Sequence, residues 1–99
     1  MSKVILTVSY EIHPEKKDDY ISLMNTLKER ITSTNNCSYS IYETIGRKNK
    51  FSEVYIFNSR EDYDNFDDQQ EAIEEIVNKI NDEFVKEGKI SSTQMMEVL

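Results

Sequence analysis

Two stretches decide the fold of this chain: YISLMNTLKERI at residues 20–31 and IEEIVNKINDEF at residues 73–84. In both, apolar side chains recur at positions i, i+3, i+4, i+7 and i+11. This spacing places them on one stripe of an α-helix, so each stretch predicts an amphipathic helix that packs one side against a core. Strand-like segments flank both helices, and the sequence therefore predicts two successive β-α-β units.

Four segments around these helices have the composition of β-strands. Apolar and polar residues alternate over residues 3–12 and 51–57, and residues 37–45 are rich in β-branched and aromatic side chains. Residues 90–99 have weaker β character and form the predicted last strand. The loop at residues 46–50 joins the second and third strands as a hairpin.

The first helix has a marked beginning, at the only His and the only Pro of the chain. Pro14 suits the first turn of a helix, where no backbone N–H is needed, and the helix is expected to run to about Thr32. His13 is interpreted as a residue of this boundary. The alternative interpretation is a catalytic base at the rim of a cleft.

The second helical region begins with a capping signal. Ser59 followed by Asp62 resembles a capping box, so a helix is expected to open directly after Ser59. The very polar residues 67–70 are expected to kink or interrupt it. The main helix then continues to about Lys86, with Gly88 as its predicted C-terminal cap.

The predicted element order is βαββαβ, in a single domain that spans residues 1–99. Two right-handed β-α-β crossovers that share one sheet give an α+β, ferredoxin-like fold, in which both helices cover one face of a four-stranded antiparallel sheet. The other face is left uncovered. A large apolar face of this kind pairs with a partner subunit, so we expect a homodimer.

Composition and charge narrow the classes of function. The chain has 99 residues, 37% of them hydrophobic and 31% charged, with neither a membrane span nor a secretory signal, and we expect a cytoplasmic globular protein. The net charge is −7, and residues 59–87 hold eleven acidic against three basic residues, which disfavours nucleic acid as a partner. Because the sequence has no membrane span, we expect no membrane partner either. Cys37, the only cysteine, is interpreted as an inert buried thiol.

The predicted hairpin brings two carboxyl groups together. If its strands close symmetrically about the loop, Glu43 lies opposite Glu53. Two carboxylates held close in an apolar environment do not both ionise readily, so one of them keeps a proton for acid or base catalysis. The alternative interpretation is that both lie near the hairpin end and pair with basic side chains or solvent.

The same register gathers aromatic side chains on the face that carries the two carboxyl groups. It places Ile41 opposite Tyr55 and Tyr39 opposite Phe57. Tyrosine rings and hydroxyl groups can orient an aromatic ligand, and core packing is the alternative interpretation. The candidate ligand-binding residues are Tyr10, Tyr39, Tyr55 and Phe57.

Several kinds of chemistry lack their motifs in this sequence. It contains no Gly-rich phosphate loop, no Cys or His pair with metal-ligand spacing, and no Ser-His-Asp set that its single His could complete. NTPase, metalloenzyme and hydrolase functions are therefore disfavoured. We expect neither a metal nor a cofactor.

Segments spread over most of the chain resemble one family. They are residues 13–15 after the opening strand, residues 35–43, residues 46–51, and residues 53–63. Together they are similar to the dimeric α+β barrel proteins, in particular the antibiotic biosynthesis monooxygenase-like group. The resemblance implies homodimers that pair sheet to sheet, and cofactor-independent oxidation of small aromatic or quinol compounds.

The chain departs from the active members of this group at two positions. Active members of the group that this chain resembles have a tryptophan on the third strand and a histidine early in the second helix. The corresponding positions of this chain hold Phe57 and Phe66. Without the histidine there is no evident axial ligand for haem. The resulting hypothesis is a monooxygenase-like protein with Glu43, Glu53 or a tyrosine as its base. The alternative is a non-catalytic homodimer that binds or senses a small molecule.

Overall fold

The computed structural model describes residues 2–66 and 71–99. Its sheet and helices follow the predicted order, with short 3-10 and π-helical turns added. The elements are β1 (Val4–Ile12), the 3-10 turn η1 (Pro14–Lys16), α1 (Lys17–Thr34), β2 (Cys37–Glu43), β3 (Lys50–Phe57), α2 (Arg60–Asp64), α3 (Glu71–Lys79), the π-helical turn η2 (Ile80–Phe84) and β4 (Val85–Met96).

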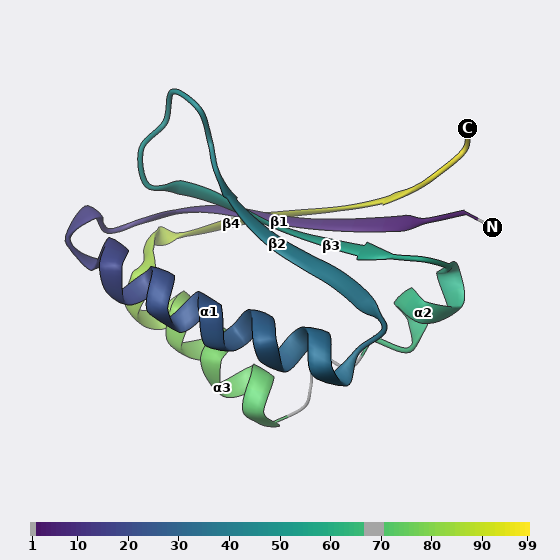
Figure 1. The fold of residues 1–99 in the computed structure, drawn as a ribbon. Helices are drawn as coiled ribbons and strands as arrows, with labels where there is room; N and C mark the ends of the chain where they lie inside the picture. Colours follow the sequence, from purple (N-terminus) through teal and green to yellow (C-terminus); the bar gives the residue numbers. More distant parts are fainter. Residues whose placement is uncertain (1, 67–70) are drawn as a thin grey trace.

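The four strands form one antiparallel sheet in the order β2-β3-β1-β4. α1 and α3 lie side by side along one face of this sheet, and none of the helices that the structure describes covers the opposite face (Figure 1). The predicted α+β, ferredoxin-like architecture is confirmed. We refer to the two sides of the sheet as the covered face and the open face.

The two apolar stripes form the helical side of the core, as predicted. On α1 the buried residues are Tyr20, Met24, Leu27 and Ile31, and on α3 and η2 they are Ile73, Ile76, Ile80 and Phe84. Leu23 and Val77, the remaining stripe positions, are partly buried against them. Full burial of such a side chain stabilises the fold by about 1.5–3 kcal/mol, so the stripes hold both helices to the covered face.

The start of α2 follows the predicted capping signal. The Ser59 side chain accepts a hydrogen bond from the backbone N–H of Asp62 at 3.1 Å, and α2 opens at Arg60. The predicted interruption at residues 67–70 lies outside the described residues. No helix among residues 2–66 and 71–99 is long and apolar enough to cross a lipid bilayer.

The second main helix ends earlier than predicted. α3 stops at Lys79, η2 adds one turn, and β4 begins at Val85, so the predicted end near Lys86 with a cap at Gly88 is wrong. The reason is tertiary, because Val85 is buried and pairs with Ile12 of β1. A partner in the sheet outweighs the helical propensity of the segment.

β4 contains a bulge directly after its first residue. Val85 and Ile90 both pair with β1, but only one residue of β1 lies between their partners, so residues 86–89 bulge out of the ladder. Glu87 and Gly88 take left-handed backbone conformations there, with φ of 59° and 66°. Gly88, the predicted helix cap, therefore lies in a bulge of β4. We call residues 86–89 the β4 bulge.

The hairpin register also differs from the prediction. Glu43 lies opposite Phe51, and Ile41 lies opposite Glu53, so the predicted Glu43–Glu53 pair is wrong. Each partner is shifted by two residues, which leaves every side chain on its predicted face but changes its neighbours. The observed pairs Tyr39–Tyr55 and Cys37–Phe57 replace the predicted pairs Ile41–Tyr55 and Tyr39–Phe57.

The register shifts because the turn covers residues 45–49, one residue earlier in the chain than the predicted loop at residues 46–50. The backbone N–H of Thr44 donates to the carbonyl of Lys50 at 2.8 Å, and the turn between them closes through positive φ angles at Gly46 and Asn49. Ile45, counted in the predicted strand for its β-branched side chain, is fully exposed in this turn. Its apolar character therefore does not indicate a strand position.

Candidate active site

Glu53 is a buried carboxyl group in the middle of the covered face. Alternation along β3 buries every second side chain, and Glu53 occupies one of these positions with only 6% of its surface exposed. Its Oε1 accepts a hydrogen bond from the Tyr39 hydroxyl at 2.6 Å and another from the Tyr55 hydroxyl at 3.2 Å. Both bonds end on Oε1, so Oε2 accepts neither of them.

A second pair of tyrosines adjoins this group. Tyr10 of β1 and Tyr20 of α1 share a hydrogen bond between their hydroxyl groups at 2.7 Å, and both residues are buried. Tyr10 also acts on Glu53 as a hydrogen-bond donor that lowers the carboxyl pKa. We call Tyr10, Tyr20, Tyr39 and Tyr55 the tyrosine cluster.

Three members of the tyrosine cluster, Tyr10, Tyr39 and Tyr55, are hydrogen-bond donors to one acceptor, Glu53. Burial raises the pKa of Tyr10, Tyr39 and Tyr55 above the ordinary phenol range, and the nearby Glu53 carboxylate raises each pKa further. These hydroxyl groups therefore keep their protons at neutral pH. They can orient Glu53 and a ligand, but they do not act as bases in this state.

The pKa of Glu53 is raised, because burial disfavours its ionised form more than the hydrogen bonds from Tyr39, Tyr10 and Tyr55 favour it. A carboxyl group with a raised pKa is a stronger base when ionised and a usable acid when protonated. This is the property that acid-base catalysis near neutral pH requires of a glutamate.

Glu53 faces a cavity of about 630 Å³, which we call the main cavity. The cavity lies between the β1, β3 and β4 part of the covered face and the helical segments α2, α3 and η2. Its volume is in the range of small-molecule sites. Its lining residues are Leu6, Val8, Tyr10, Glu53, Tyr55, Tyr63, Asp64, Phe66, Ile73, Glu74, Val77, Asn78, Ile80, Asn81, Ile90, Ser92 and Gln94.

The structure brings three of the predicted ligand-binding residues to Glu53 and separates the fourth. Tyr10 and Tyr55 line the main cavity. Tyr39 does not line it, but its hydroxyl group donates the shorter of the two hydrogen bonds to Glu53 Oε1. Phe57 is fully buried in the core and packs edge-on against Phe66, with ring centroids 5.4 Å apart.

The second predicted catalytic carboxyl group, Glu43, lies apart from Glu53. It is exposed at the hairpin end, where it forms an ion pair with Lys17 at 3.3 Å and accepts from the backbone N–H of Asn49 at 2.9 Å. These contacts lower the pKa of Glu43, the Asn49 bond most of all. The buried pair of carboxyl groups expected from the sequence is therefore not formed.

Several residues in and around the site were not identified from the sequence. Tyr20 was assigned to the core by its helical stripe, although a buried hydroxyl in an otherwise aliphatic stripe indicates a polar partner. Asn78 and Asn81 border the second stripe in sequence and line the main cavity, and the sequence pattern indicates no role for them. His13 lies at the β1–η1 junction and does not line the main cavity, and its backbone N–H donates to Phe84 at 3.0 Å.

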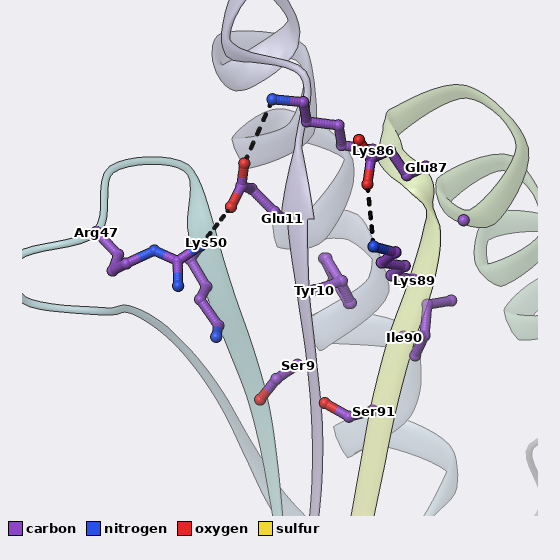
Figure 2. Close-up of a pocket in the computed structure, with 11 residues that line it drawn as sticks. Ser9, Tyr10, Glu11, Arg47, Lys50, Lys86, Glu87, Lys89, Ile90 and Ser91 are labelled. Carbon is purple, nitrogen blue, oxygen red and sulfur yellow. Dashed lines mark hydrogen bonds and ion pairs between the residues drawn. The ribbon is translucent and has the colours of Figure 1, made fainter.

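A second pocket, of about 540 Å³, lies where the open face meets the β4 bulge. Figure 2 shows basic side chains around it, from the hairpin turn, β3 and the bulge. Glu11 accepts from Arg47 at 2.8 Å and forms an ion pair with Lys86 at 3.6 Å. We call this second pocket the basic pocket. Its four cationic residues are Arg47, Lys50, Lys86 and Lys89.

The described part of the chain contains neither a cluster of metal ligands nor an activated thiol. Among residues 2–66 and 71–99, no three His, Cys, Asp or Glu side chains gather as they do around a metal ion. Cys37 is half-buried, and burial raises the pKa of its thiol. A thiol with a raised pKa is a poor nucleophile at neutral pH.

No protein-family model matches the sequence, and no curated protein matches it significantly. Solved structures do match. A candidate antibiotic biosynthesis monooxygenase from Caulobacter crescentus CB15 has a TM-score of 0.82 at 8% identity, over 99% of this chain and 92% of that chain. A conserved protein from Methanosarcina mazei Go1 has a TM-score of 0.80 at 14% identity, over 96% and 92% of the two chains.

A further match is the structure of an antibiotic biosynthesis monooxygenase, with a TM-score of 0.70 at 21% identity over 100% of this chain and 98% of that chain. At these identities the comparisons establish the fold. The chain has the ferredoxin-like α+β fold of the antibiotic biosynthesis monooxygenase-like proteins, which confirms the similarity predicted from the sequence.

Proposed function

We propose that the protein oxidises a small phenolic or quinol compound with dioxygen in the main cavity, with Glu53 as the base. The observation that carries the proposal is the position of Glu53, a buried carboxyl group with a raised pKa that faces a cavity of ligand size. The fold is shared with antibiotic biosynthesis monooxygenase-like proteins, and this likeness supports the proposed class of reaction by analogy.

In the proposed reaction, Glu53 takes a proton from the substrate and leaves an electron-rich anion. An electron-rich ring carbon of this anion, which carries one hydrogen, reduces dioxygen and forms a carbon–oxygen bond, which gives a peroxide anion. The peroxide anion takes the proton held by Glu53 and becomes a hydroperoxide. Loss of water from the hydroperoxide then converts the ring C–H into a carbonyl, so a phenol and dioxygen give a quinone and water. All four electrons come from the substrate, so the reaction needs no other reductant.

The tyrosine cluster supports this role by position. Tyr39 and Tyr55 fix one oxygen of Glu53, so the carboxyl plane is set before a ligand arrives. Tyr10 and Tyr55 also line the main cavity, where their rings can pack against a bound aromatic ligand.

The test is oxygen consumption with a panel of hydroquinones and anthrone-type phenols. Glu53→Gln is expected to lower the rate at least about a hundredfold, since it removes the base and keeps the shape. Glu43→Gln is the matched control and is expected to keep the wild-type rate. Binding of the panel without turnover by the wild type would favour the alternative, a non-catalytic binding or sensing protein.

The proposal includes pairing of two copies through the open face. Ile56, Ile5 and Met95 are direct neighbours on β3, β1 and β4, so they form an apolar row across the sheet. Met95 is 48% exposed, and no helix among residues 2–66 and 71–99 covers this face (Figure 1). A second copy is an occupant whose own open face matches this row by symmetry.

A further inference from the structure

The main cavity has an unusual distribution of charge. Three of its described lining residues carry carboxyl groups, namely Glu53, Asp64 and Glu74, and none of its described lining residues is a lysine, arginine or histidine. The basic pocket has the opposite balance of charge, with four cationic lining residues against two acidic ones, Glu11 and Glu87. The two spaces therefore attract ligands of different charge.

The three carboxyl groups are not equivalent. Glu53 lies at the buried end and is held by tyrosines. Asp64 forms an exposed ion pair with Arg60 at 3.1 Å. Glu74 is exposed on α3 and forms no ion pair with the residues that the structure describes. Its charge at the cavity is therefore uncompensated within the described chain.

Four of the described lining residues of the main cavity are aromatic. Tyr55 and Phe66 meet edge to face, with centroids 5.3 Å apart, and Tyr10 and Tyr63 complete the aromatic lining. The face of an aromatic ring carries negative charge and attracts cations. Aromatic walls together with an uncompensated carboxylate are the chemistry that recognises an organic ammonium group.

We propose that the main cavity selects aromatic compounds that carry a positively charged amine and rejects those that carry a carboxylate, with Glu74 as the residue that sets this preference. The inference rests on the proposed function in one respect, that an aromatic ligand occupies the main cavity. It adds a substrate class, the phenolic amines. The phenol ring lies toward Glu53 and the ammonium group toward Glu74.

The test compares three para-substituted phenols of similar size by calorimetry: tyramine, 4-ethylphenol and 4-hydroxyphenylacetate. They are cationic, neutral and anionic at pH 7. Tyramine is expected to bind about three- to tenfold more tightly than 4-ethylphenol, from one exposed charge pair plus a cation–π contact. 4-Hydroxyphenylacetate is expected to bind more weakly than either.

Two variants on α3 separate a local effect from the net charge. Glu74→Gln is expected to lower the tyramine preference over 4-ethylphenol at least twofold. Glu75→Gln removes the same charge from the neighbouring exposed residue, which does not line the cavity, and is expected to leave the preference unchanged. Equal effects of the two variants would assign the preference to the general acidity of the chain and overturn the role of Glu74.

The outcomes also distinguish this inference from the proposed function. If all three phenols bind equally, or the anionic one binds most tightly, the selectivity is wrong while binding of phenols stands. If none of the three binds, and the quinol panel is not oxidised, both proposals fail. Oxidation of quinols without any tyramine preference would overturn only the inference about charge.

Discussion

At the scale of single residues, the raised pKa of Glu53 is also a statement about stability. Because the folded state raises the pKa above its ordinary value of 4.5, the native protein binds this proton more tightly than the unfolded chain does. The contribution of Glu53 to stability is therefore complete below pH 4.5 and is lost as the pH rises through the folded pKa. The ionised side chain is the destabilising form.

We accordingly predict that Glu53→Gln becomes more stable relative to the wild type as the pH rises above 4.5. Urea denaturation over a pH series measures this difference, and subtraction removes the titration of the other groups. Glu43→Gln is the control of opposite sign. Since contacts lower the pKa of Glu43, its ionised form stabilises the fold, and the variant should lose relative stability over the range in which the Glu43 carboxyl ionises.

A second residue-scale prediction concerns the hydrogen bonds to Glu53. Tyr39→Phe removes the 2.6 Å bond that favours the ionised carboxyl group, so the Glu53 pKa should rise further. Tyr55→Phe removes the longer bond and should raise this pKa less. NMR titration of the Glu53 carboxyl carbon measures both, and Tyr42→Phe, at an exposed tyrosine, should leave the value unchanged.

At the scale of elements, the helices were predictable and the connections between strands were not. The stripe positions on α1 and α3 follow from periodicity, which depends on residues close in sequence. The hairpin register depends on where the turn begins, and Ile45 gave the wrong signal because an exposed β-branched residue in a turn has the same local character as one in a strand.

The candidate site was predictable only where its residues follow from the pattern within one strand. Alternation in β3 indicated that Glu53 and Tyr55 point to one face, and a register error of two residues does not change that face. Tyr39 was placed on this face but opposite the wrong residue. The hydroxyl of Tyr20 reaches Tyr10 only through the packing of α1 on the sheet, and no spacing within one element indicates such a contact.

The β4 bulge provides a prediction at this scale. Glu87 has a φ of 59°, a left-handed conformation that is unfavourable for a residue with a Cβ atom. Glu87→Gly should stabilise the fold by about 0.5–1 kcal/mol, because relief of this strain exceeds the greater freedom of glycine in the unfolded chain. Denaturation in urea measures the change.

Glu87→Ala is the control for this change. It also removes the exposed ion pair between Glu87 and Lys89 but retains a Cβ atom, so it should not stabilise the fold. Equal stabilisation by both variants would show that the charge, and not the backbone conformation, is responsible.

At the scale of the whole molecule, the sheet has one face without helices, and the proposed dimer covers it. We predict a dimer in sedimentation at micromolar concentration. Ile56→Glu places a charge in the apolar row of the open face and should give a folded monomer. Ile21→Glu, at an exposed position on α1, should remain dimeric. A wild-type monomer would contradict the pairing.

The position of β4 at the edge of the sheet has a consequence for how copies of the chain behave when crowded. An edge strand offers unpaired backbone N–H and C=O groups to any other strand, and residues 90–96, ISSTQMM, contain neither a charge nor a proline to discourage such pairing. Protection comes from the neighbouring β4 bulge, which interrupts the straight edge and carries Lys86, Glu87 and Lys89. The irregularity that shapes a pocket thus also guards the molecule against growth into β-aggregates.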